Sequence, residues 1–491
     1  MDITITPAEM KVLEQRFMAE YNVPGALLME HAAQGICHAL QRVHPGGTAL
    51  FLCGPGNNGG DGYAAARLWK DCGGSAVIIE LSAEAKGDAL LNRHLATLAG
   101  ISIMNVSSLN GQLPPCDMIV DALFGTGLSR AASGDAETLI HLANNSGKPI
   151  IAVDIPSGLD GTTGHALGKP IIADETVTFH RLKPGLLLND GPRFCGKITL
   201  QPILIPTDYD SINGLHCLSP KDLTTMIPQR DLFGHKGTFG RAVIIAGSMG
   251  MAGAAALAAN ACIKTGAGLT TIVCPKEIIP ILQTLAPGAT CVSLDNTSRL
   301  DELLTSASVI AFGCGCGTNT ALIPLFSKLI QTGCPVVLDA DALNLLNTNS
   351  DILQAHPSTY ITPHPAEAAR LLGCTTKDIT ADPLAFLHRL HKKTGSTVLL
   401  KGARTLMTDG TNTAVNRFGT PAMAKGGSGD VLTGILTGLL AQRPDRQPLQ
   451  TLQLAALIHG LCGLRAEKKH GENCVTPQDL IEHIRLDALD L

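Results

Sequence analysis

An eleven-residue stretch late in the chain combines residue types that suit phosphate chemistry. Residues 424–434 read Ala-Lys-Gly-Gly-Ser-Gly-Asp-Val-Leu-Thr-Gly. The glycines let backbone N–H groups approach an anion, and the apolar run 431–440 predicts a helix whose positive end faces the same place. Asp430 would repel a phosphate, so its expected role is to accept a proton from a substrate hydroxyl. A glycine-rich turn with Asp430 as the helix N-cap is the structural alternative.

A second glycine loop, in residues 53–62, matches the GxGxxG pattern of dinucleotide-binding folds. Glu80 ends the next predicted strand, where such folds place a ribose-binding acid. Pro55 stiffens the turn, however, and Asp61 places a negative charge where a pyrophosphate would lie. A dehydrogenase is therefore one alternative function, with these two residues against it.

Three loops in the first half follow predicted strands and carry oxygen-bearing side chains. They span residues 53–62, 121–128 and 154–161. Ligands of parallel sheets bind beyond the carboxyl ends of the strands. Asn58, Asp121 and Ser157, one from each loop, can share a hard cation there. Each of them alone would also suit a helix cap or a turn.

Strand ends in the second half carry further groups with binding chemistry. Two prolines hold His364 in a fixed loop, where it is either structural or part of a site. Lys401 and Arg404 bring two cations to a strand end, which suits a polyphosphate, although a solvated turn would look the same. Residues 313–318 form another glycine loop, suited to close approach of a ligand.

The elements expected around these loops are those of α/β folds. The predicted strands are 48–53, 76–81, 117–124, 149–155, 176–180, 197–205, 241–246, 269–274, 308–312, 336–338, 359–362 and 398–401, and the predicted helices include 7–20 with Thr6 as N-cap, 26–42, 63–72 and 252–265. Apolar strands that alternate with helices predict mostly parallel sheets covered on both faces.

Composition predicts a cytoplasmic protein with two domains. The 491 residues are too many for one core, and 45% apolar with 16% charged residues suits a globular chain. A net charge of −5 argues against nucleic acid as the main partner, and the 15 cysteines suit reduced thiols. The N-terminus has no signal-peptide core, and the soft apolar run 249–263 is too short to span a membrane. Prolines and acidic residues in 205–228 place a boundary near Gly214.

The first half resembles the epimerase domain of the NAD(P)H-hydrate repair enzymes. The motifs that carry the resemblance are GPGNNGGDG at 54–62, DALFGTGL at 121–128, AVDIPSGLDG at 152–161 and KPGLL at 183–187. The resemblance covers about residues 1–210. It implies a Rossmann-like three-layer α/β sandwich that epimerises hydrated NAD(P)H at the nicotinamide carbon bearing the added hydroxyl. It also implies a potassium ion (K+) held by Asn58, Asp121 and Ser157.

The same resemblance implies the epimerase substrate contacts. They are Asn57, Asn58, Gly59, Gly60, Asp61, Gly125, Thr126, Gly127, Leu128, Ser129, Arg130, Ala131 and Asp154. The reaction needs an acid/base group near a carbinolamine hydroxyl, and Asp154, at a strand end, is the candidate.

The second half resembles the ribokinase-like superfamily and, within it, the ADP/ATP-dependent NAD(P)H-hydrate dehydratases. The motifs are HKGTFGRAVIIAGS at 235–248, TPHPAE at 362–367, VLLKG at 398–402 and TPAMAKGGSGDVLTG at 420–434, in a match over about residues 222–488. One departure is Cys314 and Cys316, where the family loop more often reads GPGLG.

This resemblance implies two sets of contacts. Those to the nucleotide are Lys401, Gly402, Ala403, Arg404, Thr405, Gly427, Ser428 and Gly429, and those to the hydrated dinucleotide are Ala252, Gly253, Gly315, His364 and Asp430. Asp430 would assist attack of the hydroxyl on the terminal phosphate of ADP, which arrives with Mg2+. The phosphorylated hydrate would then lose phosphate, so that ADP yields AMP and phosphate.

The leading hypothesis is a bifunctional repair enzyme with an epimerase domain at 1–213 and an ADP-dependent dehydratase domain at 222–491. Its partners would be hydrated NADH or NADPH and ADP, with no nucleic acid and no membrane, in a homo-oligomer. A ribokinase-like vitamin or sugar kinase with a non-catalytic first domain is the main alternative. A nucleotide-binding regulatory or scaffold protein and a dehydrogenase are the others.

Overall fold

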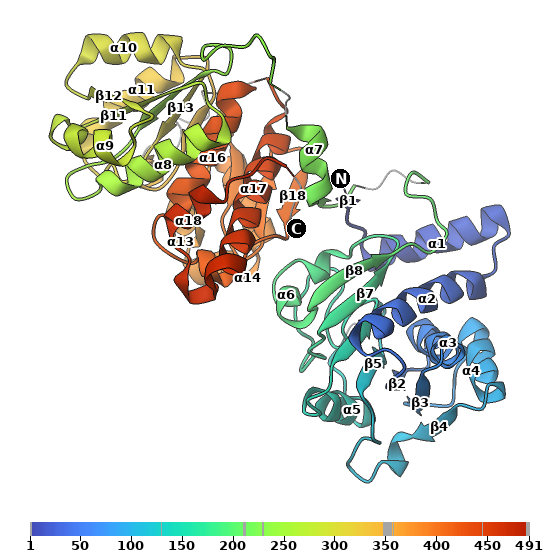
Figure 1. Ribbon diagram of the computed structural model, residues 1–491. Helices are drawn as coiled ribbons and strands as arrows, with labels where there is room; N and C mark the ends of the chain where they lie inside the picture. Colours follow the sequence, from blue (N-terminus) through green and yellow to red (C-terminus); the bar gives the residue numbers. More distant parts are fainter. Residues whose placement is uncertain are drawn as a thin grey trace. The chain divides into compact units, whose positions relative to one another are not determined.

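The computed structural model describes residues 2–128, 130–209, 213–227, 230–346, 356, 358–443 and 445–487. The chain divides into two compact units, residues 2–215 and residues 216–491, with Met1 assigned to the second. Each unit has its own sheet (Figure 1). Within the described residues no helix is both long and apolar enough to cross a membrane.

The N-terminal unit is a parallel sheet with helices on both faces. In spatial order its strands are β4 (Ser102–Asn105), β3 (Ser75–Glu80), β2 (Thr48–Cys53), β5 (Met118–Ala122), β6 (Ile150–Val153), β7 (Glu175–Phe179) and β8 (Lys197–Gln201). The helices are α1 (Pro7–Tyr21), α2 (Gly25–Val43), α3 (Asn57–Asp71), α4 (Gly87–Leu98), α5 (Asp135–Asn144) and α6 (Gly191–Phe194), and a two-residue strand, β1 (Asp2–Ile3), precedes them.

Alternate residues of one strand supply the two hydrophobic cores of this unit. Phe51 of β2 packs in the core that includes α1, α2 and α3, whereas Leu50 and Leu52 pack in the core that includes α5. A strand buried on both faces reads as a continuous apolar run, which is why the sequence located it well. Three layers, helix on sheet on helix, follow from this arrangement (Figure 1).

The C-terminal unit has a longer, mixed sheet. In spatial order its strands are β9 (His216–Cys217), β18 (Thr413–Asn416), β17 (Thr405–Thr408), β16 (Thr397–Leu400), β15 (Thr359–Ile361), β14 (Val336–Leu338), β13 (Val309–Phe312), β10 (Arg241–Ile245), β11 (Leu269–Cys274) and β12 (Thr290–Ser293). Strands from β16 to β12 pair in parallel, while β16, β17 and β18 pair as an antiparallel meander.

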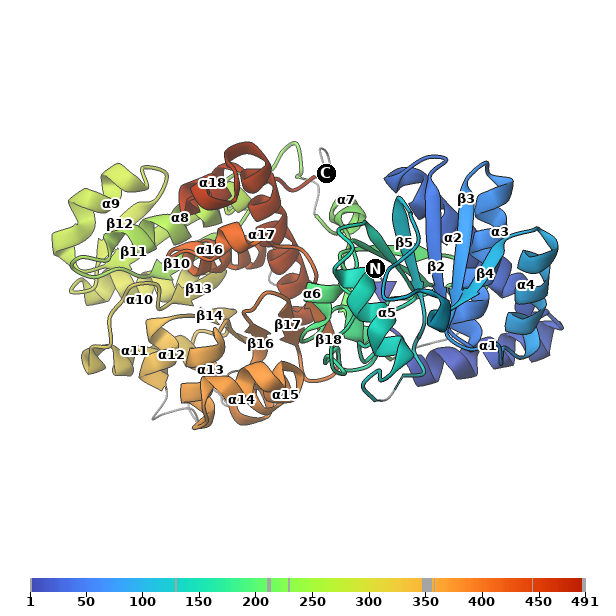
Figure 2. The same ribbon diagram turned by 90° about the horizontal axis from the view of Figure 1, so that it is seen from below.

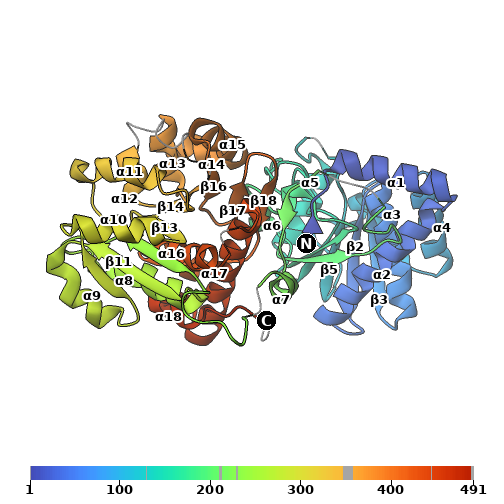
Figure 3. The same cartoon turned by 90° about the horizontal axis from the view of Figure 1, so that it is seen from above.

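Two groups of helices cover this second sheet. They are α7 (Leu223–Met226), α8 (Ala252–Thr265), α9 (Ile279–Leu285), α10 (Thr297–Ser306), α11 (Ile323–Ile330), α12 (Asp341–Leu346), α13 (Pro365–Leu372), α14 (Thr376–Ala381), α15 (Pro383–Thr394), α16 (Ser428–Gln442), α17 (Pro448–His470) and α18 (Pro477–Glu482). Helices α8, α16, α17 and α18 share one core, and α11 to α15 lie across the sheet from them (Figures 2 and 3).

Two predicted helix starts were wrong, and close packing explains the first. Helix α3 begins at Asn57, six residues before the predicted start, so most of the predicted glycine loop is helical. A Cβ at Gly59 would lie 1.8 Å from the carbonyl oxygen of Gly54, and one at Gly62 would lie 2.6 Å from Ala122 Cβ. These glycines therefore let the helix approach β2 and β5 and do not open a loop.

Helix α16 also begins earlier than predicted, at Ser428. Its N-cap is Gly427 at φ 97°, a left-handed conformation that favours glycine. Asp430 is the third residue of the helix, so the alternative in which it is the N-cap was wrong. Thr6 does cap α1 as predicted, in a capping box with Glu9.

Candidate active sites

The carboxyl ends of four neighbouring strands carry the predicted groups of the N-terminal unit. Asn58 follows β2, Asp121 is the last but one residue of β5, Asp154 follows β6, and Lys183 follows β7. These strands are consecutive in the sheet. Residues far apart in the sequence therefore meet at one edge, as the parallel topology requires.

Two of the three predicted cation ligands are hydrogen-bonded to each other, and the third contacts the loop after β5. Ser157 donates from N to Asp121 Oδ2 at 2.7 Å and from Oγ to Asp121 Oδ1 at 2.6 Å. The Asn58 side chain abuts Gly125, since a Cβ there would lie 3.0 Å from Asn58 Oδ1. Asn58 Nδ2 is buried without a hydrogen-bond partner. Asp121 is fully buried, and burial raises its pKa to about 6 against the hydrogen bonds from Ser157.

A second group in this unit centres on a buried lysine. Lys183 is 1% exposed, and its Nζ lies 2.7 Å from Asp154 Oδ1 and donates to Phe179 O at 2.9 Å. Asp154 has φ 65°, an uncommon value for a non-glycine residue. Asp61 and Glu14 interact electrostatically with the same pair.

Glu80, the ribose-binding acid of the dehydrogenase alternative, is committed to other contacts. Both nitrogens of the Arg93 fork donate to it, at 2.7 and 2.9 Å, and Tyr63 Oη donates at 3.3 Å. Glu80 is 4% exposed. A buried carboxylate held in this way stabilises the fold. It is not available to bind the ribose of a dinucleotide, as the dehydrogenase alternative requires.

The predicted loop 125–131 reaches the site at its first residue, where Gly125 meets Asn58. Its last residue, Ala131, approaches Gly168 instead. Ser129 lies outside the described residues.

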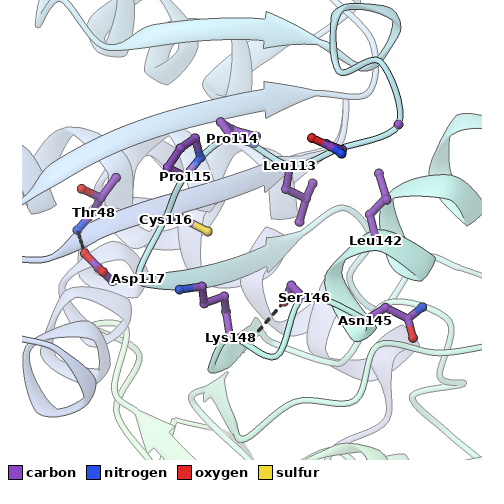
Figure 4. A pocket seen from close by; sticks show the side chains of 12 residues that line it. Thr48, Leu113, Pro114, Pro115, Cys116, Asp117, Leu142, Asn145, Ser146 and Lys148 are labelled. Atoms are coloured by element: carbon purple, nitrogen blue, oxygen red, sulfur yellow. Dashed lines mark hydrogen bonds between the residues drawn. The ribbon is translucent and has the colours of Figure 1, made fainter.

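One cavity of the N-terminal unit lies away from this edge of the sheet. It has a volume of about 660 Å3 and is lined by Thr48, Asp117 and Lys148 among others (Figure 4). Thr48 begins β2 and Asp117 immediately precedes β5, so this cavity lies at the amino ends of the strands. None of the predicted site residues lines it.

In the C-terminal unit the candidate groups again follow neighbouring strands. Cys314 follows β13, Asp339 follows β14, His364 follows β15 and Lys401 follows β16, and Asp430 joins them from the first turn of α16. Burial raises the pKa of Asp430 to about 6, and the hydrogen bond with the Cys314 thiol opposes that rise. Asp430 is thus a half-buried carboxylate beside the positive end of a helix, suited to act as a base.

An ion pair between a partly buried lysine and a buried aspartate interacts electrostatically with Asp430. Lys401 Nζ is 2.7 Å from Asp339 Oδ1, and Thr433 Oγ1 donates to Asp339 Oδ2 at 2.8 Å. Glu367 Oε2 lies 3.8 Å from the same ammonium. A Cβ at Gly429 would lie 3.4 Å from Lys401 Nζ, so the glycine loop and the lysine meet.

Two other predicted contact residues, His364 and Gly315, lie near residues of this part of the C-terminal unit. His364 caps α13, with its Nε2 3.4 Å from Glu367 Oε1. A Cβ at Gly315 would lie 2.9 Å from Ala254 Cβ, which brings the glycine loop to the start of α8, where Ala252 and Gly253 lie.

Arg404 and Ser428, like Lys401, are predicted nucleotide contacts that have partners within the unit. Arg404 Nη1 donates to the carbonyl oxygen of Arg417 at 2.6 Å. The Ser428 N–H donates to Lys425 O at 3.3 Å, and its hydroxyl lies 3.3 Å from His459 Nε2. The N–H groups of Gly427 and Gly429 are thus the better candidates for contact with a phosphate.

Sequence reasoning did not single out several of these groups. Asp339 was noted only as part of a strand-end segment, and Lys183 only as part of a motif. Burial and an oppositely charged partner mark Asp339 and Lys183 in the structure, but neither property is visible in one sequence. Glu14 lies on a predicted helix and carried no signal.

Known proteins are similar to this chain over nearly its whole length. The sequence model of the NAD(P)H-hydrate dehydratase family matches residues 242–486, and that of the YjeF-related protein N-terminus matches residues 25–185. The bifunctional NAD(P)H-hydrate repair enzyme Nnr of Moorella thermoacetica is 34% identical over 98% of this chain and 95% of its own. That of Vibrio cholerae is 34% identical over 98% of this chain and 97% of its own. The chain belongs to the bifunctional NAD(P)H-hydrate repair enzymes.

A solved structure places the C-terminal unit in a fold superfamily. A ribokinase-like superfamily protein from Enterococcus faecalis is 30% identical, with a TM-score of 0.51, and the match covers 56% of this chain and 95% of the other. The predicted α/β class, with a ribokinase-like second half, is confirmed. Family membership also confirms the resemblance drawn from the motifs.

Proposed function

We propose that the two units catalyse two steps of one repair reaction. The N-terminal unit interconverts the R and S forms of hydrated NADH or NADPH. The C-terminal unit dehydrates the S form to NAD(P)H and converts ADP to AMP and phosphate. The observation that supports this most is the position of Asp430, at the first turn of α16 and beside the Asp339–Lys401 pair.

In the C-terminal unit, Asp430 accepts the proton of the substrate hydroxyl while that oxygen attacks the terminal phosphorus of ADP. The N–H groups of Gly427 and Gly429 stabilise the charge on the transferring group. Mg2+ that arrives with ADP would neutralise part of the charge of its phosphates. AMP leaves, and the phosphorylated hydrate then expels phosphate, a far better leaving group than hydroxide, while a neighbouring carbon loses a proton.

The proposal includes K+ at Asn58, Asp121 and Ser157. One observation supports a cation there: the carboxylate of Asp121 is fully buried, and its hydrogen bonds come from neutral donors. Carboxylate, hydroxyl and amide oxygens suit a hard cation. Bound there, K+ would neutralise Asp121 and hold the loops after β2, β5 and β6 together.

Assembly and location complete the proposal. We expect a homo-oligomer, because closed symmetry is the usual state of such enzymes. We expect a cytoplasmic protein, since it has 15 free cysteines and its substrates are redox cofactors.

Absorbance of the dihydronicotinamide ring tests the proposal directly. Mixed epimers of hydrated NADH are incubated with the full chain, ADP and Mg2+, and NADH, AMP and phosphate are measured. The wild type should recover all NADH, with one AMP and one phosphate each. Asp430→Asn should recover none, because its amide cannot accept the proton. Asp121→Ala should give a fast phase for the S form and then the slow rate of spontaneous epimerisation.

The outcomes separate the proposed function from its main rival. A stable phosphorylated product without NADH would favour a kinase. Recovery of NADH without cleavage of ADP would contradict the phosphorylation step.

A further inference from the structure

Ser248 ends the motif at 235–248 and is not among the predicted contacts. It lies in the loop that joins β10 to α8. Its hydroxyl donates to the carbonyl oxygen of Gly315, in the loop after β13, at 2.8 Å. Its own carbonyl oxygen accepts from the N–H of Met251, directly before α8, at 2.8 Å. One residue thus connects the loop after β13 with the start of α8.

A backbone contact attaches the loop that contains Ser248 to the dehydratase site. The N–H of Gly247 donates to the carbonyl oxygen of Cys314 at 2.9 Å. The thiol of Cys314 in turn hydrogen-bonds Asp430. Cys314 therefore contacts both this loop and the proposed catalytic base.

The hydroxyl of Ser248 satisfies a buried backbone group. Gly315 is buried, and no other hydrogen bond to its carbonyl oxygen is found among the described residues. Gly315 has φ 65°, and a Cβ there would lie 3.1 Å from Met251 Cβ. The loop after β13 thus packs closely on the residue before α8. Without Ser248 the buried carbonyl would lose its donor, and this loop would lose the bond that fixes it.

The order of the strands separates this surface from the one that suits ADP. Lys401 follows β16, whereas Ser248 follows β10, and β15, β14 and β13 lie between those strands. Neighbouring strands are about 4.8 Å apart, so the two strand ends are about 19 Å apart. Asp430, which hydrogen-bonds Cys314 after β13, lies between them. With the phosphates of ADP on the Lys401 side of Asp430, the body of the hydrated dinucleotide lies over the ends of β13 and β10.

We propose that Ser248 is a positioning residue that holds the loop after β13 and the start of α8 together as one binding surface for the hydrated dinucleotide. This rests on the proposed dehydratase function. Ser248 acts through Gly315 and through the residues before α8. Met249 and Met251, in the same loop, are 70% and 50% exposed, so the outer face of the loop is open to a ligand. Loss of the hydroxyl therefore weakens binding of the hydrate and leaves binding of ADP unchanged.

Initial rates of NADH recovery by the full chain test this. The S form of hydrated NADH is varied at saturating ADP and Mg2+, and ADP is then varied at saturating hydrate. Ser248→Ala should raise KM for the hydrate about tenfold, because the buried carbonyl that it leaves belongs to the hydrate surface alone. Its kcat and its KM for ADP should stay within about twofold of the wild type. Ser248→Thr keeps a hydroxyl donor and should restore the KM of the wild type.

Ser308→Ala is the matched control. Ser308 directly precedes β13, and its Oγ accepts from the N–H of Arg241, the first residue of β10, at 3.0 Å. This variant removes a serine hydrogen bond between the same two strands, but at their amino ends. Both KM values should therefore match those of the wild type. A rise in KM for the hydrate as large as that of Ser248→Ala would indicate general loosening of the sheet and overturn the inference.

The remaining outcomes separate this inference from the function on which it rests. Two KM values that stay unchanged in Ser248→Ala, or that rise together, would contradict the positioning role. No recovery of NADH by the wild type would instead overturn the proposed dehydratase function.

Hydrogen exchange of the wild type decides the matter if Ser248→Ala does not fold. The hydrate alone should slow amide exchange in residues 247–253 and 313–317, whereas ADP with Mg2+ alone should not. Equal protection of these residues by both ligands, or protection by neither, would overturn the inference.

Discussion

A carboxylate paired with a buried or partly buried lysine occurs at both candidate sites. Asp154–Lys183 and Asp339–Lys401 each have an N–O distance of 2.7 Å, and each pair follows parallel strands. In the first pair the aspartate itself takes a left-handed φ, and in the second the next residue, Ala340, does. Such backbone strain persists only where the surrounding structure imposes it, and it is common at functional sites.

Cys314, in the glycine loop after β13, lies beside Asp430. Its thiol hydrogen-bonds Asp430 and lowers the pKa of that carboxylate, which burial has raised to about 6. A base acts when ionised, so dehydratase activity should be lost as the pH falls through about 6. Cys314→Ala removes the donor, so the acid limb of the kcat/KM profile should move up by about half a pH unit.

The control for this prediction is Cys314→Ser, whose hydroxyl keeps a donor and should leave the limb near its original position. An acid limb that Cys314→Ala does not move would show that the thiol has no part in tuning Asp430.

At the scale of elements, the close approach of α8 and α16 depends on glycines, which have no side chain. A Cβ at Gly434 of α16 would lie 2.3 Å from the carbonyl oxygen of Ala258, and one at Gly438 would lie 2.7 Å from that of Cys262. Small residues spaced four apart thus let the helices approach closely. This contact positions the first turn of α16, where Asp430 lies, against the start of α8.

Gly434→Ala should therefore destabilise the C-terminal unit by about 1–3 kcal/mol, because the added methyl group overpacks the helix contact. Gly253→Ala is the matched change in α8, where a Cβ meets open space. It should be neutral or stabilising by up to about 1 kcal/mol. Urea unfolding followed by circular dichroism measures both. Equal effects of the two substitutions would contradict the packing argument.

At the scale of the whole molecule, each unit has its own core and its own strand-end site. The chain has a single tryptophan, Trp69, fully buried in the core of the N-terminal unit. Its fluorescence therefore reports unfolding of that unit, whereas circular dichroism reports both units.

Ligands should consequently stabilise the units separately. Replacing N-methylglucamine chloride with KCl at equal ionic strength should raise the unfolding free energy seen by Trp69 by about 1.4 kcal/mol at ten times Kd. Asp121→Asn should abolish this gain, because it removes the charge that attracts the cation. ADP with Mg2+ should shift only the transition that Trp69 does not report. A K+ effect unchanged in Asp121→Asn would exclude this cation site.

The sequence by itself determined the architecture and most of the strand-end loops. Buried parallel strands are continuous apolar runs, so β2, β11 and β14 were located to the residue. The edge strand β4 and the meander strands β17 and β18 were missed, because short or partly exposed strands lack that signal. Glycines misled the prediction at α3, since the same residue that opens a loop also permits close packing.

Only the tertiary structure decided which groups act together. Asp154 and Lys183 belong to two separate motifs, and only the fold brings their side chains to 2.7 Å from each other. Cys314 and Asp430 lie more than a hundred residues apart in the sequence. They meet because β13 ends, and α16 begins, at the same edge of the sheet. A pattern in the sequence identifies chemistry that is local along the chain. Proton transfer and charge pairing depend on distances between segments, and folding alone sets those distances.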